Sequence, residues 1–434
     1  MGPDWAKTSP RGLRHTGSST KPLRMGTHGF RVIGLISGTS VDGIDVAAGD
    51  LHAEDGTVVL TPLGELDVPY PEPLREALLA ALPPNPCTAG ELTRLDTGVG
   101  QAFADAARRG AEELAGGRGD LVASLGQTVF HWVEDGQVLG TLQLGQPAWI
   151  AERTGLPVCA DLRARDVAAG GHGAPLASTL DQLWLRGLAE DTGRPVAALN
   201  LGGIANITVV AAGEPATAYD TGPANALLDL AAHRVTGRRS DVDGRLALAG
   251  SVRPDLLDRL LADPYFAAAP PKSTGKEHFN APYLDTATGG LDPIDPADLL
   301  ATLTELTAVT VADQCRRHGV STVIASGGGV ANPAVMTALA RNLGGSTVLK
   351  TSDELGLPGA GKEAYLTALL GWLTWCGAPG TVPSATGARG PRLLGALVPG
   401  AGPLILPAPL GGTVTRLRVA EKAGQTVGEI HARC

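Results

Sequence analysis

Cysteine is scarce in this chain of 434 residues. The five cysteines are odd in number and far apart, at Cys87, Cys159, Cys315, Cys376 and Cys434. Such spacing fits neither a disulfide framework nor paired zinc ligands. The chain also lacks an apolar run long enough to span a membrane. We therefore expect a protein of a reducing compartment, the cytoplasm, with no membrane partner.

Positive charge is in deficit as well. Lys and Arg number 35 against 44 Asp and Glu, which gives a formal net charge of -9. A surface for nucleic acid or anionic lipid needs clustered cations, so we expect no nucleic-acid partner and look for a small-molecule ligand. Residues 1–28 are polar and basic without an apolar segment, which predicts a disordered N-terminal extension and not a signal peptide.

Glycine and apolar residues are plentiful, and the length is typical of two domains with a core each. The most informative stretch is 31–49, where two apolar runs flank a turn that contains Gly38, Thr39, Ser40, Asp42 and Gly43. This pattern predicts a β-hairpin. Glycine lets backbone N–H groups approach an anion, and the two hydroxyls add donors, so the tip suits phosphate. The alternative is an ordinary hairpin turn.

A second stretch, 195–210, repeats this pattern around Gly202 and Gly203. Two such hairpins predict two structurally similar halves, each presenting a backbone loop to one anion between them. Further along, a strand at 321–326 runs into three glycines before a helix capped by Asn332. We interpret this turn as a nucleotide site in preference to a simple tight turn.

Residues 162–177, LRARDVAAGGHGAPLA, combine charge with glycine. Asp166 lies in a predicted loop between two arginines, Arg163 and Arg165, and a glycine-rich segment. A carboxylate beside cations stays ionised, and one above a flexible glycine floor is a candidate general base. The alternative is a surface loop in which the arginines neutralise Asp161 and Asp166.

Polar groups at predicted strand ends extend this site. The strand at 120–130 ends in Gly126, Gln127 and Thr128, at the edge where open α/β sheets bind ligands. Asp220 ends another strand, where it could hold Mg²⁺ through water or merely cap the next helix. Glu363 lies in the first turn of a predicted helix that could face the same cleft.

In the order of these parts the chain resembles the superfamily of acetate and sugar kinases and actin-like ATPases. More narrowly, it resembles the anhydro-N-acetylmuramic acid kinase family over roughly residues 31–399. The motifs that carry this resemblance are GLISGTSVDGID, LGQTVFH, DLRARDVAAGGHGAPL, LNLGGIANITV, YDTGPANALLD, PKSTGKEHFN, LLATLTELTA, GGG with Asn332, and KEA followed by PSATGA.

The resemblance implies an α/β, two-lobed actin-like ATPase and sugar-kinase fold, with duplicated domains and an ATP cleft between them. After the extension at 1–28, a first domain at 29–192 would hold the first hairpin and the catalytic loop. A second domain at 193–377 would hold the second hairpin and the GGG turn. The segment 378–434 would return toward the first domain, with a peripheral last part.

The resemblance also implies a reaction. Such an enzyme opens the 1,6-anhydro ring of anhydro-N-acetylmuramic acid with water and phosphorylates O6, giving N-acetylmuramic acid 6-phosphate and ADP during peptidoglycan recycling. ATP and Mg²⁺ are the implied cofactors. A homodimer is one possible oligomeric state. Two alternatives remain: an ATP-dependent kinase of another sugar or carboxylate, and a nucleotide-dependent regulatory module without turnover.

The patterns and the resemblance together assign site residues. Asp166 is the implied base that activates water. Substrate contacts are expected from Gln127, Thr128, Arg163, Gly171 and Asp220, and Mg²⁺ contacts, direct or through water, from Asp42, Asp220 and Glu363. The expected ATP-binding residues are Gly38, Thr39, Ser40, Val41, Asp42, Gly43, Ile44, Asp45, Gly202, Gly203, Asn206, Gly327, Gly328 and Gly329.

Four positions depart from the family's pattern. Leu125 replaces a histidine, which changes local contacts but not the expected reaction, and His172 replaces a glutamine. Ala224 replaces a glycine and needs a φ angle that tolerates a Cβ atom. Lys276 replaces an arginine, which keeps the charge but gives up the bidentate guanidinium.

Overall fold

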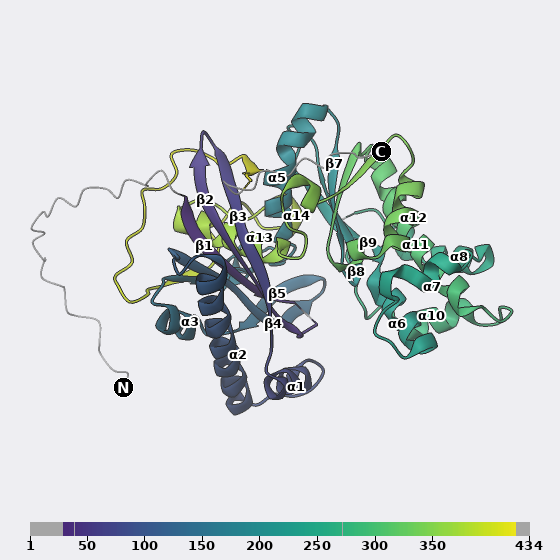
Figure 1. Ribbon diagram of the computed structural model, residues 1–434, viewed down its shortest axis with the longest axis horizontal. Coiled ribbons are helices and arrows are strands. Elements are labelled where there is room, and N and C mark those ends of the chain that lie inside the picture. Colours follow the sequence, from purple (N-terminus) through teal and green to yellow (C-terminus); the bar gives the residue numbers. More distant parts are fainter. Residues whose placement is uncertain (1–28, 39, 271, 422–434) are drawn as a thin grey trace, which may run out of the picture.

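The computed structural model describes residues 29–38, 40–270 and 272–421 (Figure 1). The predicted disordered extension at 1–28, Thr39 and the last part of the C-terminal segment lie outside these ranges. Within them, no helix combines the length and apolarity that crossing a membrane requires.

Two β-sheets form the framework of the molecule. The first sheet has the strand order β12-β6-β4-β1-β2-β3-β13, with β5 paired to β4. Its strands are β1 (Phe30–Ser37), β2 (Gly43–Glu54), β3 (Thr57–Pro69), β4 (Leu121–Glu134), β5 (Gln137–Leu144), β6 (Val158–Ala160), β12 (Ala396–Val398) and β13 (Arg416–Val419). The second sheet has the order β11-β10-β7-β8-β9, from β7 (Val196–Leu201), β8 (Ile204–Val210), β9 (Thr217–Pro223), β10 (Thr322–Ser326) and β11 (Val348–Thr351).

The two sheets share one topology. In the first, β1-β2 and β2-β3 are antiparallel whereas β1-β4 and β4-β6 are parallel. In the second, β7-β8 and β8-β9 are antiparallel whereas β7-β10 and β10-β11 are parallel. The predicted α/β fold with two similar halves is thus confirmed, and the two glycine-tipped hairpins, β1-β2 and β7-β8, occupy equivalent positions.

Helices cover both faces of the sheets (Figure 1). The first half contains α1 (Glu72–Ala81), α2 (Ala89–Arg109), a π-helical turn (Gly110–Leu114), α3 (Pro147–Thr154), α4 (Ala164–Ala168) and α5 (Ala177–Thr192). The second half contains α6 (Asn225–Thr236), α7 (Arg245–Ala249), α8 (Pro254–Leu261), α9 (Pro264–Ala267), α10 (Ala281–Thr288), α11 (Pro296–Arg317) and α12 (Pro333–Leu343), with 3₁₀ turns at Val242–Gly244, Gly328–Ala331 and Asp353–Leu355. Last come α13 (Lys362–Trp375) and α14 (Pro383–Thr386).

The first sheet is buried on both faces. Ile33 and Leu35 of β1 pack in the cluster that contains α2, whereas Val32 and Ile36 pack in the cluster that contains α13. This explains why β1 is a nearly continuous apolar run instead of an alternating one. Glu363 is the one residue of α13 that is not buried.

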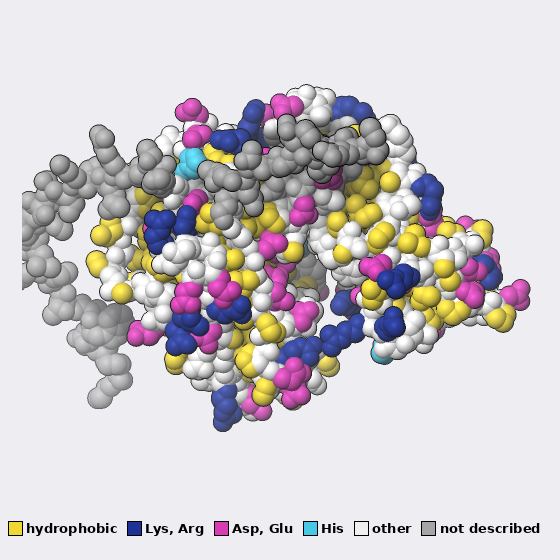
Figure 2. Space-filling model, viewed as in Figure 1, with side chains coloured by type: hydrophobic (Ala, Val, Ile, Leu, Met, Phe, Trp, Pro, Cys, Tyr) yellow, Lys and Arg dark blue, Asp and Glu magenta, His cyan; other side chains and the backbone are white. Residues whose placement is uncertain are grey.

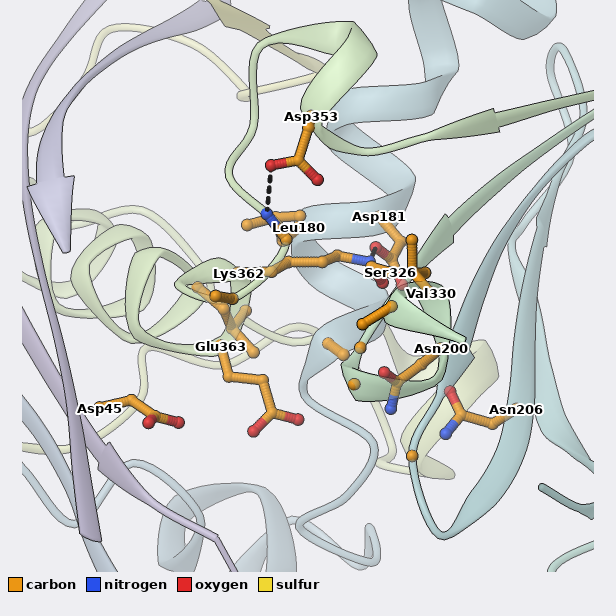
Figure 3. A pocket seen from close by; sticks show the side chains of 18 residues that line it. Asp45, Leu180, Asp181, Asn200, Asn206, Ser326, Val330, Asp353, Lys362 and Glu363 are labelled. Carbon is orange, nitrogen blue, oxygen red and sulfur yellow. Dashed lines mark hydrogen bonds and ion pairs between the residues drawn. The ribbon is translucent and has the colours of Figure 1, made fainter. Parts of the chain in front are cut away.

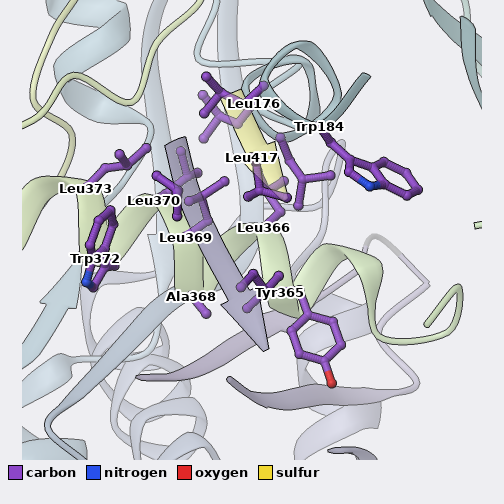
Figure 4. Packing of buried hydrophobic residues seen from close by; sticks show 14 of the residues in the cluster. Leu176, Trp184, Tyr365, Leu366, Ala368, Leu369, Leu370, Trp372, Leu373 and Leu417 are labelled. Carbon is purple, nitrogen blue, oxygen red and sulfur yellow. The ribbon is translucent and has the colours of Figure 1, made fainter. Parts of the chain in front are cut away.

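The packing of α13 depends on two glycines. A Cβ at Gly34 would lie 2.0 Å from the carbonyl oxygen of Ala364, and a Cβ at Gly371 would lie 2.4 Å from Cβ of Ala123. The helix backbone therefore lies directly against β1 and β4, and its leucines belong to the same buried cluster as Leu417 of β13 (Figure 4). The domain boundaries stay predictions, and this packing favours grouping α13 with the first half.

The structure corrects three sequence predictions. β4 does not end at residues 126–128 but continues to Glu134, because its second part pairs with β5. β9 continues beyond Asp220 to Pro223, because it stays paired with β8. Within the last part of segment 378–434, which was predicted to be peripheral, β13 instead pairs with β3, and Leu417 is 4% exposed.

Candidate active site

A cavity of about 560 Å³, a size typical of small-molecule sites, is lined by residues of both halves (Figure 3). Asp45 comes from β2, Gly202 and Asn206 come from the β7-β8 hairpin, and Gly327 and Gly328 follow β10. The molecular surface is hollowed between the two halves, with acidic side chains along the side of the first half (Figure 2). The structure thus brings parts of both predicted hairpins and the glycine turn to one cavity.

Other predicted ATP-binding residues lie in the same turns but away from the cavity wall. Val41 and Ile44 are 1% and 0% exposed and pack in the core, so their side chains do not fit the predicted nucleotide contact. Gly329 serves close packing, since a Cβ there would lie 2.7 Å from Cβ of Leu201. Thr39 lies outside the described residues, and the roles of Gly38, Ser40, Asp42, Gly43 and Gly203 stay predictions.

The cavity wall is strongly acidic. Among the described residues, it carries four carboxylates, from Asp45, Asp181, Asp353 and Glu363, and one cationic side chain, Lys362. A polyphosphate would be repelled by such a wall unless a cation entered with it. The donor set thus favours a ligand that brings its own positive charge.

The side chains of Asp45 and Glu363 lie on the same side of the cavity, opposite Asn200 and Asn206 (Figure 3). Burial, followed by the charges of Asp67 and Glu363, raises the pKa of Asp45 to about 6. The charged form of Asp45 is therefore in need of a counter-ion.

The fit to Mg²⁺ follows from this pair. No group of three or more metal-binding side chains occurs in the described part of the chain. Mg²⁺, however, keeps several waters and needs only one or two carboxylates besides phosphate oxygens. Asp45 and Glu363 meet this need, whereas Asp220 is not on the wall and accepts hydrogen bonds from Ser273 Oγ and Thr274 N at 2.9 and 3.0 Å.

Asp42 and Asp220 are thus less favoured than predicted as metal ligands. Asp42 Oδ1 accepts a 2.7 Å hydrogen bond from Ser40 Oγ. Asp220 does not cap α6 either, because Ala224 is at the N-cap position. Its carboxylate instead fixes the loop at residues 273–274.

The raised pKa of Asp45 makes a testable prediction about stability. A carboxyl group whose pKa is raised on folding stabilises the folded state when it is protonated. For Asp45 this stabilisation is fully present below pH 3.8, its unfolded pKa, and is lost as the pH rises through about 6. We expect Asp45→Asn to raise Tm at pH 8 by about 1–3 °C, because it removes the cost of burying a charge and then the repulsion by nearby carboxylates, both reduced by partial exposure. The gain should be smaller at pH 5, where the Asp45 carboxyl is largely protonated. Thermal unfolding without Mg²⁺ measures this.

The control is Glu152→Gln, because Glu152 is exposed on α3. We expect it to leave Tm unchanged at both pH values. An Asp45→Asn gain of equal size at pH 5 and pH 8 would contradict the electrostatic explanation.

Asp166 lies outside this cavity wall and is fully buried. It belongs to the short helix α4, not to a loop, and no ion pair joins it to either neighbouring arginine in the described chain. Its Oδ2 accepts a 2.8 Å hydrogen bond from Gly173 N, and its Oδ1 accepts one of 2.8 Å from Thr386 Oγ1. Hydrogen bonds thus replace the predicted cationic neighbours.

Gly171 is required by the position of this carboxylate. A Cβ at residue 171 would lie 2.3 Å from Asp166 Oδ2. The predicted role of Gly171 as a substrate contact stays untested, but its lack of a side chain lets the carboxylate lie against the backbone.

Arg163 connects the two regions. Its Nη1 donates a 2.7 Å hydrogen bond to Gly173 O, while its Nε is buried without a partner. Burial lowers the pKa of Arg163, and the charge of Glu363 opposes that shift. Arg163 is therefore held against the Asp166 segment, within reach of the charge of Glu363 on the cavity wall.

The other predicted substrate contacts are less suited to that role. Gln127 is fully buried, where its Oε1 accepts from Ser37 Oγ at 2.7 Å and its Nε2 donates to Gly38 O at 3.1 Å. Its side chain fixes the first hairpin tip instead of facing a substrate. Thr128 Oγ1 accepts a 3.3 Å hydrogen bond from Gln143.

A family model described as anhydro-N-acetylmuramic acid kinase matches residues 30–400 of this chain. The chain belongs to this family. A relative named anhydro-N-acetylmuramic acid kinase from Streptomyces coelicolor is 56% identical over 392 residues, which cover 90% of this chain and 99% of the relative. Relatives of the same name from Streptomyces avermitilis and Rhodococcus erythropolis are 56% and 51% identical, and cover 87% and 86% of this chain and 97% and 94% of their own.

The departures from the kinase family's pattern are accommodated locally. Ala224 has a negative φ of −126°, as a residue with a Cβ atom requires, although its ψ of −109° lies outside the main β and α regions. Leu125 is 3% exposed and packs in the core, and His172 is exposed and donates its backbone N–H to Thr386 O. Lys276 reaches the tip of the second hairpin, since a Cβ at Gly203 would lie 3.0 Å from its Cε.

Sequence reasoning missed an ion pair inside the cavity. Lys362 Nζ lies 2.7 Å from Asp181 Oδ1, and the two side chains are 10% and 6% exposed. Lys362 Nζ also donates to Ser326 Oγ at 3.3 Å. This contact joins α5, α13 and the end of β10 (Figure 3). The only sequence signal was Lys362 itself, in the KEA motif.

Proposed function

We propose that this chain uses ATP to open 1,6-anhydro-N-acetylmuramic acid with water and to phosphorylate O6, giving N-acetylmuramic acid 6-phosphate and ADP in peptidoglycan recycling. Its membership in the kinase family supports the reaction as a whole. The structural observation that carries the proposal is a cavity lined by Asp45 of the first hairpin, Gly202 and Asn206 of the second and the glycine turn after β10. A buried, hydrogen-bonded carboxylate, Asp166, supports it as the candidate base.

The two hairpins and the glycine turn would hold the phosphates of ATP. Phosphoryl transfer depends mainly on positioning and charge stabilisation, which backbone N–H groups and the Asn200 and Asn206 amides are suited to supply. Asp45 and Glu363 would hold Mg²⁺, which neutralises phosphate charge when bound. Arg163, a substrate contact expected from the sequence, would bind an oxygen of the sugar.

Asp166 would act as general base on the attacking water. It takes a proton while the water oxygen bonds to the anomeric carbon. The bond from that carbon to O6 breaks, and O6 takes the γ-phosphoryl group as ADP leaves. Because the carboxylate is fully buried in this conformation, we expect water to reach it only after the two halves or the segment 170–173 move.

The mass of the product tests this proposal. Incubation with Mg²⁺, ATP and the anhydro sugar should add a phosphoryl group and the elements of water in equal amounts. A gain of phosphate alone would favour an ordinary sugar or carboxylate kinase. ATP binding without ADP release on adding the sugar would favour a regulatory module.

Two further features remain proposals. A reaction that consumes ATP fits a cytoplasmic location. A homodimer is one assembly open to the chain, and sedimentation of the purified protein would decide between monomer and dimer.

A further inference from the structure

The short helix α14 and the residues after it lie against the segment that carries Asp166. Thr386, the last residue of α14, is 2% exposed. Its Oγ1 donates a 2.8 Å hydrogen bond to Asp166 Oδ1, and its backbone oxygen accepts one of 2.8 Å from His172 N. A residue 220 positions away in sequence thus holds one oxygen of the carboxylate.

A further, longer contact is consistent with this direction of the hydroxyl. Ala388 N points to Thr386 Oγ1 at 3.5 Å, so one lone pair faces an N–H group and the hydroxyl proton is directed to Asp166. Gly173 N donates to the other oxygen, Oδ2. Each carboxylate oxygen therefore has one donor, which fixes the plane of the group.

We propose that Thr386 is a positioning residue for the base: its hydroxyl orients the Asp166 carboxylate and leaves one lone pair of Oδ1 for the attacking water. This inference rests on the proposed function, because it assumes that Asp166 is the base. Thr386 itself need not touch the substrate.

The turn has enough other anchors to stay in place without this hydroxyl. Ser384 Oγ donates to Ala216 O at 2.8 Å, and Arg389 N donates to Ala169 O at 3.0 Å. The backbone oxygen of Thr386 keeps its own bond to His172. A substitution at Thr386 that removes only the hydroxyl therefore tests the bond to Asp166 and not the attachment of the turn.

The charged neighbours of Asp166 are few. Arg163 reaches it only through Gly173, and Arg389 points its guanidinium toward Ala168 O at 3.4 Å. His172 is exposed and contacts the turn through its backbone. The hydroxyl of Thr386 is thus the one side-chain donor to the carboxylate among the described residues.

The test compares Thr386→Val with Thr386→Ser in the full chain, using Mg²⁺, ATP and the anhydro sugar. Loss of a hydrogen bond to a charged group should lower kcat by about 10-fold or more, with KM for ATP within about twofold of wild type. The acidic limb of the kcat/KM profile should move to higher pH. Thr386→Ser should restore both, because it restores the donor.

The matched control is Thr381→Val. Thr381 is a buried threonine of the same segment whose Oγ1 accepts from Arg392 N, away from Asp166. We expect it to lower Tm without moving the pH profile. If Thr386→Val does not fold, the same kinetic measurements are made on Thr386→Ala.

The result that would overturn the proposal is a Thr386→Val or Thr386→Ala enzyme with the kcat and pH profile of Thr381→Val. Failure of the proposed function would look different, because wild type itself would then not form the ring-opened phosphorylated product. Normal wild-type product with an unaffected Thr386 variant refutes only the positioning role.

Discussion

Asp166→Asn is expected to lower kcat by about 10²–10⁴-fold, the usual contribution of a general base. Asn is nearly isosteric with Asp and cannot take a proton from water at neutral pH. Its Oδ1 can still accept from Gly173 N, and the Thr386 hydroxyl can rotate to accept from its Nδ2, so both contacts survive. Nucleotide affinity should stay within about threefold, because Asp166 is not on the cavity wall.

Steady-state turnover and nucleotide titration measure the two effects separately. The matched control is Asp161→Asn, at an exposed carboxylate whose φ of 55° Asn tolerates well. We expect this variant to turn over at nearly the wild-type rate. Near-normal activity in Asp166→Asn would rule out the base assignment, whereas equal loss in both variants would point to disruption of the whole segment.

The features that could be predicted from sequence are those that depend on neighbours along the chain. The two hairpins follow from apolar runs around glycine, and α11 follows from Asp295, whose Oδ1 accepts the N–H of Ala297 at 2.8 Å, and from Pro296 at its first position. Because both hairpins occur in equivalent places of repeated sheets, Asp45, Gly202 and Asn206 meet at one cavity as expected.

The features that could not be predicted depend on contacts between distant segments. Thr386 binds Asp166 across 220 positions, and no local pattern shows this. Gln127 has the chemistry of a ligand-binding residue, but its side chain is buried and bonded to Ser37, Gly38 and Tyr70. A polar residue near an expected strand end therefore predicts a ligand contact only when no distant segment occupies its polar groups.

Lys362→Met is expected to lower the free energy of unfolding by about 3–5 kcal/mol, because it leaves the Asp181 carboxylate buried without its partner. Lys362 and Asp181 are 10% and 6% exposed, so water cannot readily solvate the remaining charge. The double variant Asp181→Asn/Lys362→Met should recover most of this loss, since no charge is then buried. Urea unfolding measures all three proteins.

An exposed ion pair serves as a control that separates the effect of burial on stability from the effect of losing any ion pair. Arg245 and Asp243 form a 3.0 Å ion pair whose side chains are 77% and 59% exposed. Arg245→Met should cost less than about 1 kcal/mol, as is usual for exposed pairs. A loss in Lys362→Met no larger than in Arg245→Met would contradict the importance of the buried pair.

Among the Lys362 variants, the change in ATP affinity should differ from the change in folding stability. Lys362 is the one cationic side chain on the cavity wall within the described residues, so both the single and the double variant lose the positive charge that phosphates would meet. We expect ATP affinity to fall by about 10-fold in both, although only the single variant is strongly destabilised. If the double variant bound ATP as wild type does, Lys362 would serve only to neutralise Asp181, and the phosphates would be held by the hairpin backbones and Mg²⁺ alone.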